Sequence, residues 1–221
     1  MTCSHCLAIE KVFDQRQAEK DLKRYRRKGA PKTTGILIDA IRETGIEGLT
    51  LLDIGGGIGI IRHELLNAGV SSVISVEGSP SFLEAAKQEG ERQGRKHLSG
   101  YLHGDFVDLA IEIPPADIVT LDKVICCYPD MQQLVQLSCE RAGKIYAVVY
   151  PVDTWWMKAG VRFHNLVRKW QRNPFRAYVH PAEKIESLIR KSGLRRCFFR
   201  KKIPWYIAVY RRESSNHGVS I

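Results

Sequence analysis

The chain has 221 residues, of which 44% are hydrophobic and 26% charged, and its net charge is +10. That length and apolar fraction suit one globular domain with a full-sized core. The longest uncharged apolar run, residues 145–152, is far shorter than the roughly 18 residues of a transmembrane helix. The N-terminus becomes charged too early for a secretory signal. We therefore expect a soluble, cytoplasmic protein.

The six cysteines are scattered along the chain and form no disulfide framework. Cys3-Ser4-His5-Cys6 offers two or three zinc ligands, but no second CxxC or HxxxH pair completes a tetrahedral site. We therefore predict no metal centre and interpret these thiols as incidental, while metal binding by Cys3 and Cys6 remains the open alternative.

The N-terminal part is predicted to be helical. Residues 9–28 form a strongly charged helix, which Gly29-Ala30-Pro31 ends, and Thr33 or Thr34 can cap a second helix that runs to about Glu43.

Short apolar runs then alternate with helical stretches, which predicts an α/β fold with a parallel sheet and helices on both faces. The last two runs are joined closely around Pro204 and predict a strand pair at the sheet edge. Residues 213–221 are expected to be a disordered tail. The seven predicted strands are 49–54, 71–77, 99–105, 116–123, 143–151, 196–203 and 205–212.

One segment, residues 152–182, is too long for an ordinary connection between a strand and a helix. Apolar residues recur in it at helical spacing, so we predict an inserted amphipathic helix that acts as a lid over the substrate. A plain core helix would show the same stripe and is the alternative. The stripe consists of Trp156, Ala159, Phe163, Leu166, Val167 and Trp170.

The stretch LLDIGGGIGII at 51–61 predicts a tight turn between a buried strand and a helix, where nucleotide-like cofactors bind. Gly55, Gly57 and Gly59 spell GxGxG, whereas a dinucleotide fold would need its third glycine at position 60, which is Ile60. The turn also lacks a lysine or arginine for a pyrophosphate.

Acidic residues stand at the predicted ends of successive strands, where open α/β sheets bind ligands. Asp53 can meet a positively charged amine or order the glycine turn. Glu77 can accept hydrogen bonds from both hydroxyls of a ribose. Asp105 can accept from an adenine amine, with Phe106 beside the base, or cap the helix that follows.

The chain resembles the class I S-adenosylmethionine-dependent methyltransferases over roughly residues 30–212. The resemblance implies a Rossmann-like sheet of seven strands, mostly parallel with the last strand antiparallel, and S-adenosylmethionine as methyl donor. We expect an N-terminal helical cover at 1–30 and a methyltransferase domain at 31–212 that contains the lid. The four motifs that carry the resemblance are DIGGGIG (53–59), VEGSPSFLEAA (76–86), GDFVDL (104–109) and ADIVTLDKV (116–124).

The expected site has a cofactor side and an acceptor side. Methyl transfer depends mainly on the alignment of acceptor, methyl group and sulfur, so a catalytic base is optional. The cofactor side is expected to use Asp53, Gly55, Gly57, Gly59, Glu77, Gly78, Asp105, Phe106 and Asp122. Catalytic candidates are Asp122, Tyr128 and His180, and substrate candidates are Tyr150, Asp153, Trp155 and His164.

The acceptor is expected to be a small, partly apolar molecule. Residues 116–194 are loosely similar to the C-terminal part of magnesium-protoporphyrin methyltransferases, which suggests an apolar acceptor that bears acidic groups. Between Lys158 and Arg212 the chain has 16 Lys and Arg but only two acidic residues. That charge keeps open an RNA- or DNA-modifying enzyme and peripheral contact with a membrane. A non-catalytic binding module is the third reading; monomer and homodimer are both open.

Overall fold

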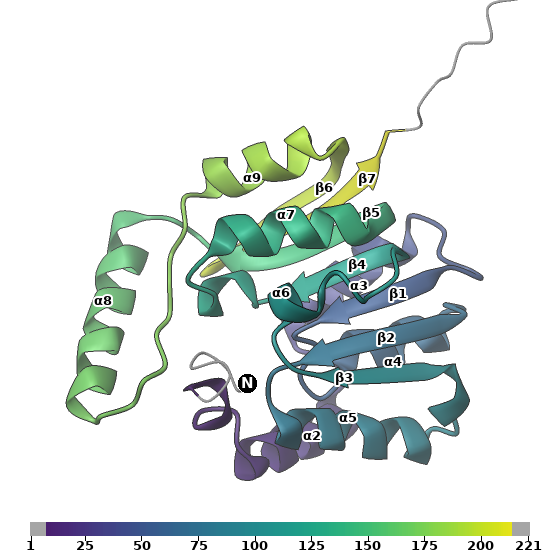
Figure 1. The fold of residues 1–221 in the computed structure, drawn as a ribbon, viewed down its shortest axis with the longest axis horizontal. Helices are drawn as coiled ribbons and strands as arrows, with labels where there is room; N and C mark the ends of the chain where they lie inside the picture. Colours follow the sequence, from purple (N-terminus) through teal and green to yellow (C-terminus); the bar gives the residue numbers. More distant parts are fainter. Residues whose placement is uncertain (1–7, 214–221) are drawn as a thin grey trace, which may run out of the picture.

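The computed structural model describes residues 8–213, which build one seven-stranded sheet with helices on both faces (Figure 1). The strand order is β3-β2-β1-β4-β5-β7-β6, and only β7 runs antiparallel to its neighbours. This confirms the predicted sheet and its antiparallel last strand. The strands are β1 (Thr50–Ile54), β2 (Ser72–Glu77), β3 (Ser99–His103), β4 (Ala116–Asp122), β5 (Ala142–Pro151), β6 (Leu194–Lys202) and β7 (Trp205–Arg212).

The central strands are apolar on both sides because helices cover both faces of the sheet. Ile118, Val119 and Leu121 of β4 are fully buried. Side chains of α6, α7 and α9 complete the core on one face, and those of α3 and α4 complete it on the other. The helices are α2 (Gln15–Lys28), α3 (Lys32–Arg42), α4 (Ile60–Asn67), α5 (Pro80–Arg92), α6 (Phe106–Leu109), α7 (Met131–Arg141), α8 (Trp155–Trp170) and α9 (Ala182–Lys191), with short 3-10 helices at η1 (Lys96–Leu98) and η2 (Ile125–Cys127).

The N-terminal helices differ from the prediction in two details. The helix expected over 9–28 is interrupted: the chain turns at 11–14, and α2 starts after Asp14, whose carboxylate accepts from the Gln17 N–H at 2.9 Å. The cap expected at Thr33 or Thr34 is also wrong, because α3 already begins after Pro31, whose fixed backbone suits a helix start. Cys3 and Cys6, the open alternative for metal binding, and the tail after Glu213 lie outside the described residues.

The insertion forms the predicted helix, but α8 stands beside the sheet and has no buried residue (Figure 1). Trp155, Phe163, Leu166 and Trp170 are 79%, 69%, 64% and 86% exposed. The alternative of a plain core helix is therefore wrong.

At the end of β1, Asp53 is only 1% exposed and supports the glycine turn from below. Its Oδ1 accepts from the Thr120 hydroxyl at 2.6 Å, which joins β1 to β4. A Cβ on Gly56 would lie 2.3 Å from Asp53 Oδ2, so the turn passes over the carboxyl group without room for a side chain. Burial raises the pKa of Asp53 to about 7, although the Thr120 hydrogen bond and the charge of Arg62 oppose the shift.

We predict that Asp53 makes the folded protein less stable as the pH rises from about 4 to 7. The folded state holds this proton more tightly than the unfolded chain, whose aspartates titrate near pH 3.9, so ionisation favours unfolding across that window. Between about pH 4 and 7 the parent should lose on the order of a few kcal/mol in its free energy of unfolding through Asp53, and Asp53→Asn should not show this loss. Urea denaturation at several pH values measures both proteins. The exposed Asp108 gives the control variant Asp108→Asn. Parallel pH profiles of Asp53→Asn and the parent would contradict the prediction.

The second prediction concerns α8. Because Phe163 and Trp170 are exposed, Phe163→Ser/Trp170→Ser should change the free energy of unfolding by no more than about 0.5 kcal/mol. Ile185→Ser on α9 is the control, since Ile185 is 1% exposed in the core and its replacement should cost several kcal/mol. Chemical denaturation measures both. If the α8 variant lost as much free energy of unfolding as Ile185→Ser, the helix would have to pack against the protein, contrary to the prediction.

Candidate functional site

A cavity of about 770 Å³ opens at the carboxyl ends of β1, β2 and β4. Its volume is within the range of roughly 300–1,000 Å³ typical of small-molecule sites. Three parts of the chain enclose it: the loops after these strands, helices α2 and α3, and the tip of the β6–β7 hairpin. The residues that line it include Arg24, Lys32, Thr34, Gly55, Gly57, Glu77, Asp122, Lys123, Lys202, Ile203, Pro204 and Trp205.

The glycine turn presents bare backbone to this cavity. Gly55 and Gly57 have φ angles of 61° and 60°, which side-chain-bearing residues rarely adopt, and both line the cavity. A Cβ on Gly55 would lie 2.6 Å from Val124 Cγ2. Gly59, at φ 80°, does not line the cavity; it lets the start of α4 pack closely, because a Cβ there would lie 3.3 Å from that of Ala86.

Glu77 ends β2 and connects the two loops around the cavity. Its Oε2 accepts from the Gly57 N–H at 2.8 Å and its Oε1 from the Ser79 N–H at 2.9 Å. Burial raises the pKa of Glu77, while these backbone donors favour the ionised form. Each carboxylate oxygen has a second lone pair, so the group can also accept from a ligand's hydroxyls.

A smaller cavity of about 70 Å³ adjoins the first and shares Gly55 and Glu77 with it. Gly78, Asp105 and Phe106 line it. Asp105 caps α6 through the Val107 N–H at 2.9 Å and also accepts from the Tyr128 hydroxyl at 3.0 Å. The carboxylate therefore both caps a helix and faces a cavity with an apolar wall.

At the end of β4, Asp122 and Lys123 connect the sheet to α3. The Thr34 hydroxyl donates to Asp122 Oδ2 at 2.6 Å, and Lys123 Nζ lies 3.1 Å from Asp122 Oδ1. Lys123 has an unusual φ of 64° and places its Nζ 5.7 Å from the centre of the Trp205 ring. Asp122 is thus held on the cavity wall with its charge paired.

Several predicted site residues lie away from both cavities. Asp53 supports the turn from behind. Tyr150 is buried in the core against Tyr206, and Asp153 accepts from the Ala182 N–H at the start of α9. Trp155 and His164 are on the exposed helix α8, and neither lines a cavity.

Tyr128 and His180, two of the predicted catalytic residues, are brought together, but not at the main cavity. His180 Nε2 lies 3.0 Å from the carbonyl oxygen of Tyr128, and its ring stacks on Tyr178. Burial lowers the pKa of His180. The Tyr128 hydroxyl meets Asp105 in the smaller cavity.

Sequence reasoning did not find the outer wall of the main cavity. Lys202, Ile203, Pro204 and Trp205 form the tip of the β6–β7 hairpin and reach the same sheet edge as the glycine turn. A signal was present: a last strand antiparallel to β5 must begin where β5 ends, and Trp205 does pair with Pro151.

The residues present fit an S-adenosyl group. Gly55 and Gly57 line the cavity with bare backbone at positive φ, and the carboxylate of Glu77 accepts from the Gly57 N–H beside them. In the smaller cavity, Asp105 provides a hydrogen-bond acceptor for an adenine amine and Phe106 provides an apolar surface for the ring. Within residues 8–213, no group of three or more His, Cys, Asp or Glu could hold a metal ion.

Comparison with known proteins agrees with this geometry. Residues 52–144 match a methyltransferase domain family. The ribosomal protein L11 methyltransferase of Alteromonas mediterranea is 29% identical over 126 residues, 53% of this chain and 43% of that protein. The chain therefore spans less than half the length of this curated relative.

Two similar solved structures show the same fold. Magnesium protoporphyrin IX methyltransferase from Synechocystis PCC 6803, with bound SAH, has a TM-score of 0.70 at 16% identity, covering 95% of this chain and 100% of that one. An O-methyltransferase family protein from Burkholderia thailandensis has a TM-score of 0.72 at 17% identity, covering 94% and 63%. Residues 52–144 therefore carry a methyltransferase domain, and the whole chain, with its glycine turn, strand-end acids and strand order, has the fold of the class I S-adenosylmethionine-dependent methyltransferases.

Proposed function

We propose that the protein transfers a methyl group from S-adenosylmethionine to a small, partly apolar acceptor that bears an acidic group. The observation that carries the proposal is the composition of the main cavity, where the glycine turn and Glu77 face an apolar wall with basic residues at its rim.

The sulfonium of the cofactor supplies an activated methyl group, so the chain's own residues have to bind, align and exclude water. Glu77 and the glycine turn would hold the ribose side, and Asp105 with Phe106 the adenine side. Asp122 lies on the wall between these groups and the hairpin tip. Its charge is already paired with Lys123, so we assign it a role in positioning rather than proton transfer.

The acceptor would contact the outer wall. Pro204 and Trp205 are half-buried and offer an apolar surface, while Arg24, Lys32 and Lys202 are exposed at the rim. A positive rim raises the local concentration of anionic molecules and disfavours cations. These features support an acceptor with an apolar body and a carboxylate or similar group.

The alternative is a nucleic-acid-modifying enzyme that uses the basic C-terminal half. Strand β6 lies at the sheet edge and exposes Arg195, Arg196, Arg200, Lys201 and Lys202. Arg195 and Arg196 are already paired with Glu213 and Glu186, which reduces the charge available for phosphates. Proteins similar to this chain also include a methyltransferase named for a ribosomal protein, so a protein acceptor belongs in the same test.

The third prediction tests cofactor binding. S-adenosylmethionine at 100 times its dissociation constant should stabilise the protein by about 2.7 kcal/mol, seen as a higher melting temperature. Glu77→Ala should lose most of this shift, because the carboxylate that both positions the glycine turn and faces the ligand is gone. Glu84→Ala, on the exposed side of α5, is the control. Equal shifts for Glu77→Ala and the parent would refute the assigned cofactor site.

The fourth prediction tests the acceptor side. A screen with labelled S-adenosylmethionine against porphyrinoids, quinones, polyketides, ribosomal protein and total RNA should give turnover with an apolar small molecule that carries an acid. Lys202→Ala should then raise KM for that acceptor about threefold to tenfold, with little change for its neutral ester. The neighbouring Lys201→Ala is the control, since Lys201 does not line the cavity. Turnover of RNA or ribosomal protein alone would refute the small acceptor.

A further inference from the structure

We propose that α8 is an interfacial helix that docks the protein on an anionic membrane surface. Its exposed aromatic side chains would enter the boundary between headgroups and acyl chains, and its basic residues would face the anionic headgroups. This inference concerns where the protein works and does not depend on the proposed acceptor.

The first observation is a continuous apolar arc on α8. At about 100° per residue, Trp155, Leu166, Trp170, Phe163 and Trp156 fall within an arc of roughly 100°. They are 79%, 64%, 86%, 69% and 40% exposed, so the whole arc is open to solvent. Contiguous exposed apolar surface of this kind marks a binding surface. Bulky aromatics on one face of a helix are typical of membrane-interface helices.

The second observation is that the opposite side of α8 is the one attached to the protein. Asn165 exchanges two hydrogen bonds with the backbone of Ala177, at 2.7 and 2.9 Å. The Arg168 guanidinium lies 5.1 Å from the centre of the buried Phe175 ring. These contacts fix the rotation of the helix, so the arc faces outward. None of the arc residues lines either cavity, and a lid would need the reverse orientation.

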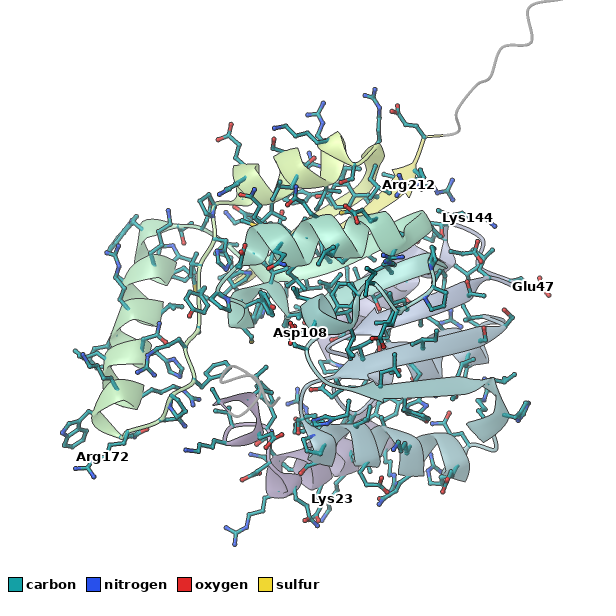
Figure 2. The ribbon with its side chains drawn as sticks, viewed as in Figure 1. Lys23, Glu47, Asp108, Lys144, Arg172 and Arg212 are labelled. Carbon is teal, nitrogen blue, oxygen red and sulfur yellow. The ribbon has the colours of Figure 1, made fainter. Side chains whose placement is uncertain are left out.

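The third observation is charge. The helix contains four Lys and Arg and no acidic residue. Lys158, Arg162 and Lys169 lie beside the arc and make no ion pair with any residue in the range 8–213. Arg172, just after the helix, points away from the protein (Figure 2).

The charges also discriminate between occupants of this surface. A second copy seated on the arc would bring like-charged Lys158, Arg162 and Lys169 together, which is costly. Anionic lipids, by contrast, are attracted by about 1 kcal/mol per basic residue near the surface. Within residues 8–213, no helix is long and apolar enough to cross a bilayer. The contact that we infer is a peripheral one.

Tryptophan fluorescence provides a direct test, because three of the four tryptophans, Trp155, Trp156 and Trp170, lie on the arc. We expect a blue shift and co-sedimentation with vesicles of phosphatidylcholine and phosphatidylglycerol, and neither with phosphatidylcholine alone. Phe163→Ser/Leu166→Ser should weaken binding by roughly tenfold or more. Ile111→Ser is the matched control, since Ile111 is 85% exposed but belongs to the loop before β4 and not to α8.

The charge contribution is tested separately. Replacing Lys158, Arg162 and Lys169 by Gln should weaken binding about fivefold per residue, while Arg190→Gln/Lys191→Gln on α9 should have little effect. Failure to bind the anionic vesicles, equal binding to neutral ones, or full binding by Phe163→Ser/Leu166→Ser would each overturn the proposal. So would a dimer in sedimentation equilibrium that this variant abolishes, because the arc would then be a protein interface. All these readouts measure association alone, so they are separable from a failure of methyl transfer.

Discussion

The site depends on the carboxylate of Glu77, which accepts one N–H from the turn after β1 and another from the turn after β2. Neighbouring parallel strands bring their carboxyl ends to one edge of a sheet, but they do not fix the loops that follow. Glu77 does so, because two backbone donors offset the cost of burying its charge. Both cavities share this residue, so the group that sets the position of the glycine turn also lines the space in both cavities.

The other strand-end acids also hold neighbouring elements together. Asp53 joins β1 to β4 through Thr120, Asp105 is bound by Tyr128, and Asp122 receives the hydroxyl of Thr34 from α3. Each acid therefore sits in a prearranged network before any ligand binds. Such preorganisation suits a reaction that requires alignment more than acid–base chemistry, because little reordering has to accompany binding.

The fold could be predicted because alternating apolar runs and a glycine turn are local signals. All seven strands and the edge pair appeared where expected. The outer wall of the main cavity was missed because only the topology of the sheet brings the tip of the β6–β7 hairpin to the glycine turn. The insertion drew attention through its aromatic stripe, but a stripe does not tell which way it faces. The contacts of Asn165 and Arg168 with Ala177 and Phe175 set that direction, and periodicity cannot predict the path of the irregular segment that contains these two partners.

The hairpin tip at Lys202–Trp205 has a consequence for how such an enzyme can diversify. It joins the last two strands of the described sheet and lines the cavity more than a hundred residues after the glycine turn. Its length and side chains can change without disturbing the hydrogen bonds around Glu77. Under the proposed function, substitutions at residues 202–205 would change the range of acceptors, while the residues proposed to bind the cofactor, all between positions 53 and 122, stay the same.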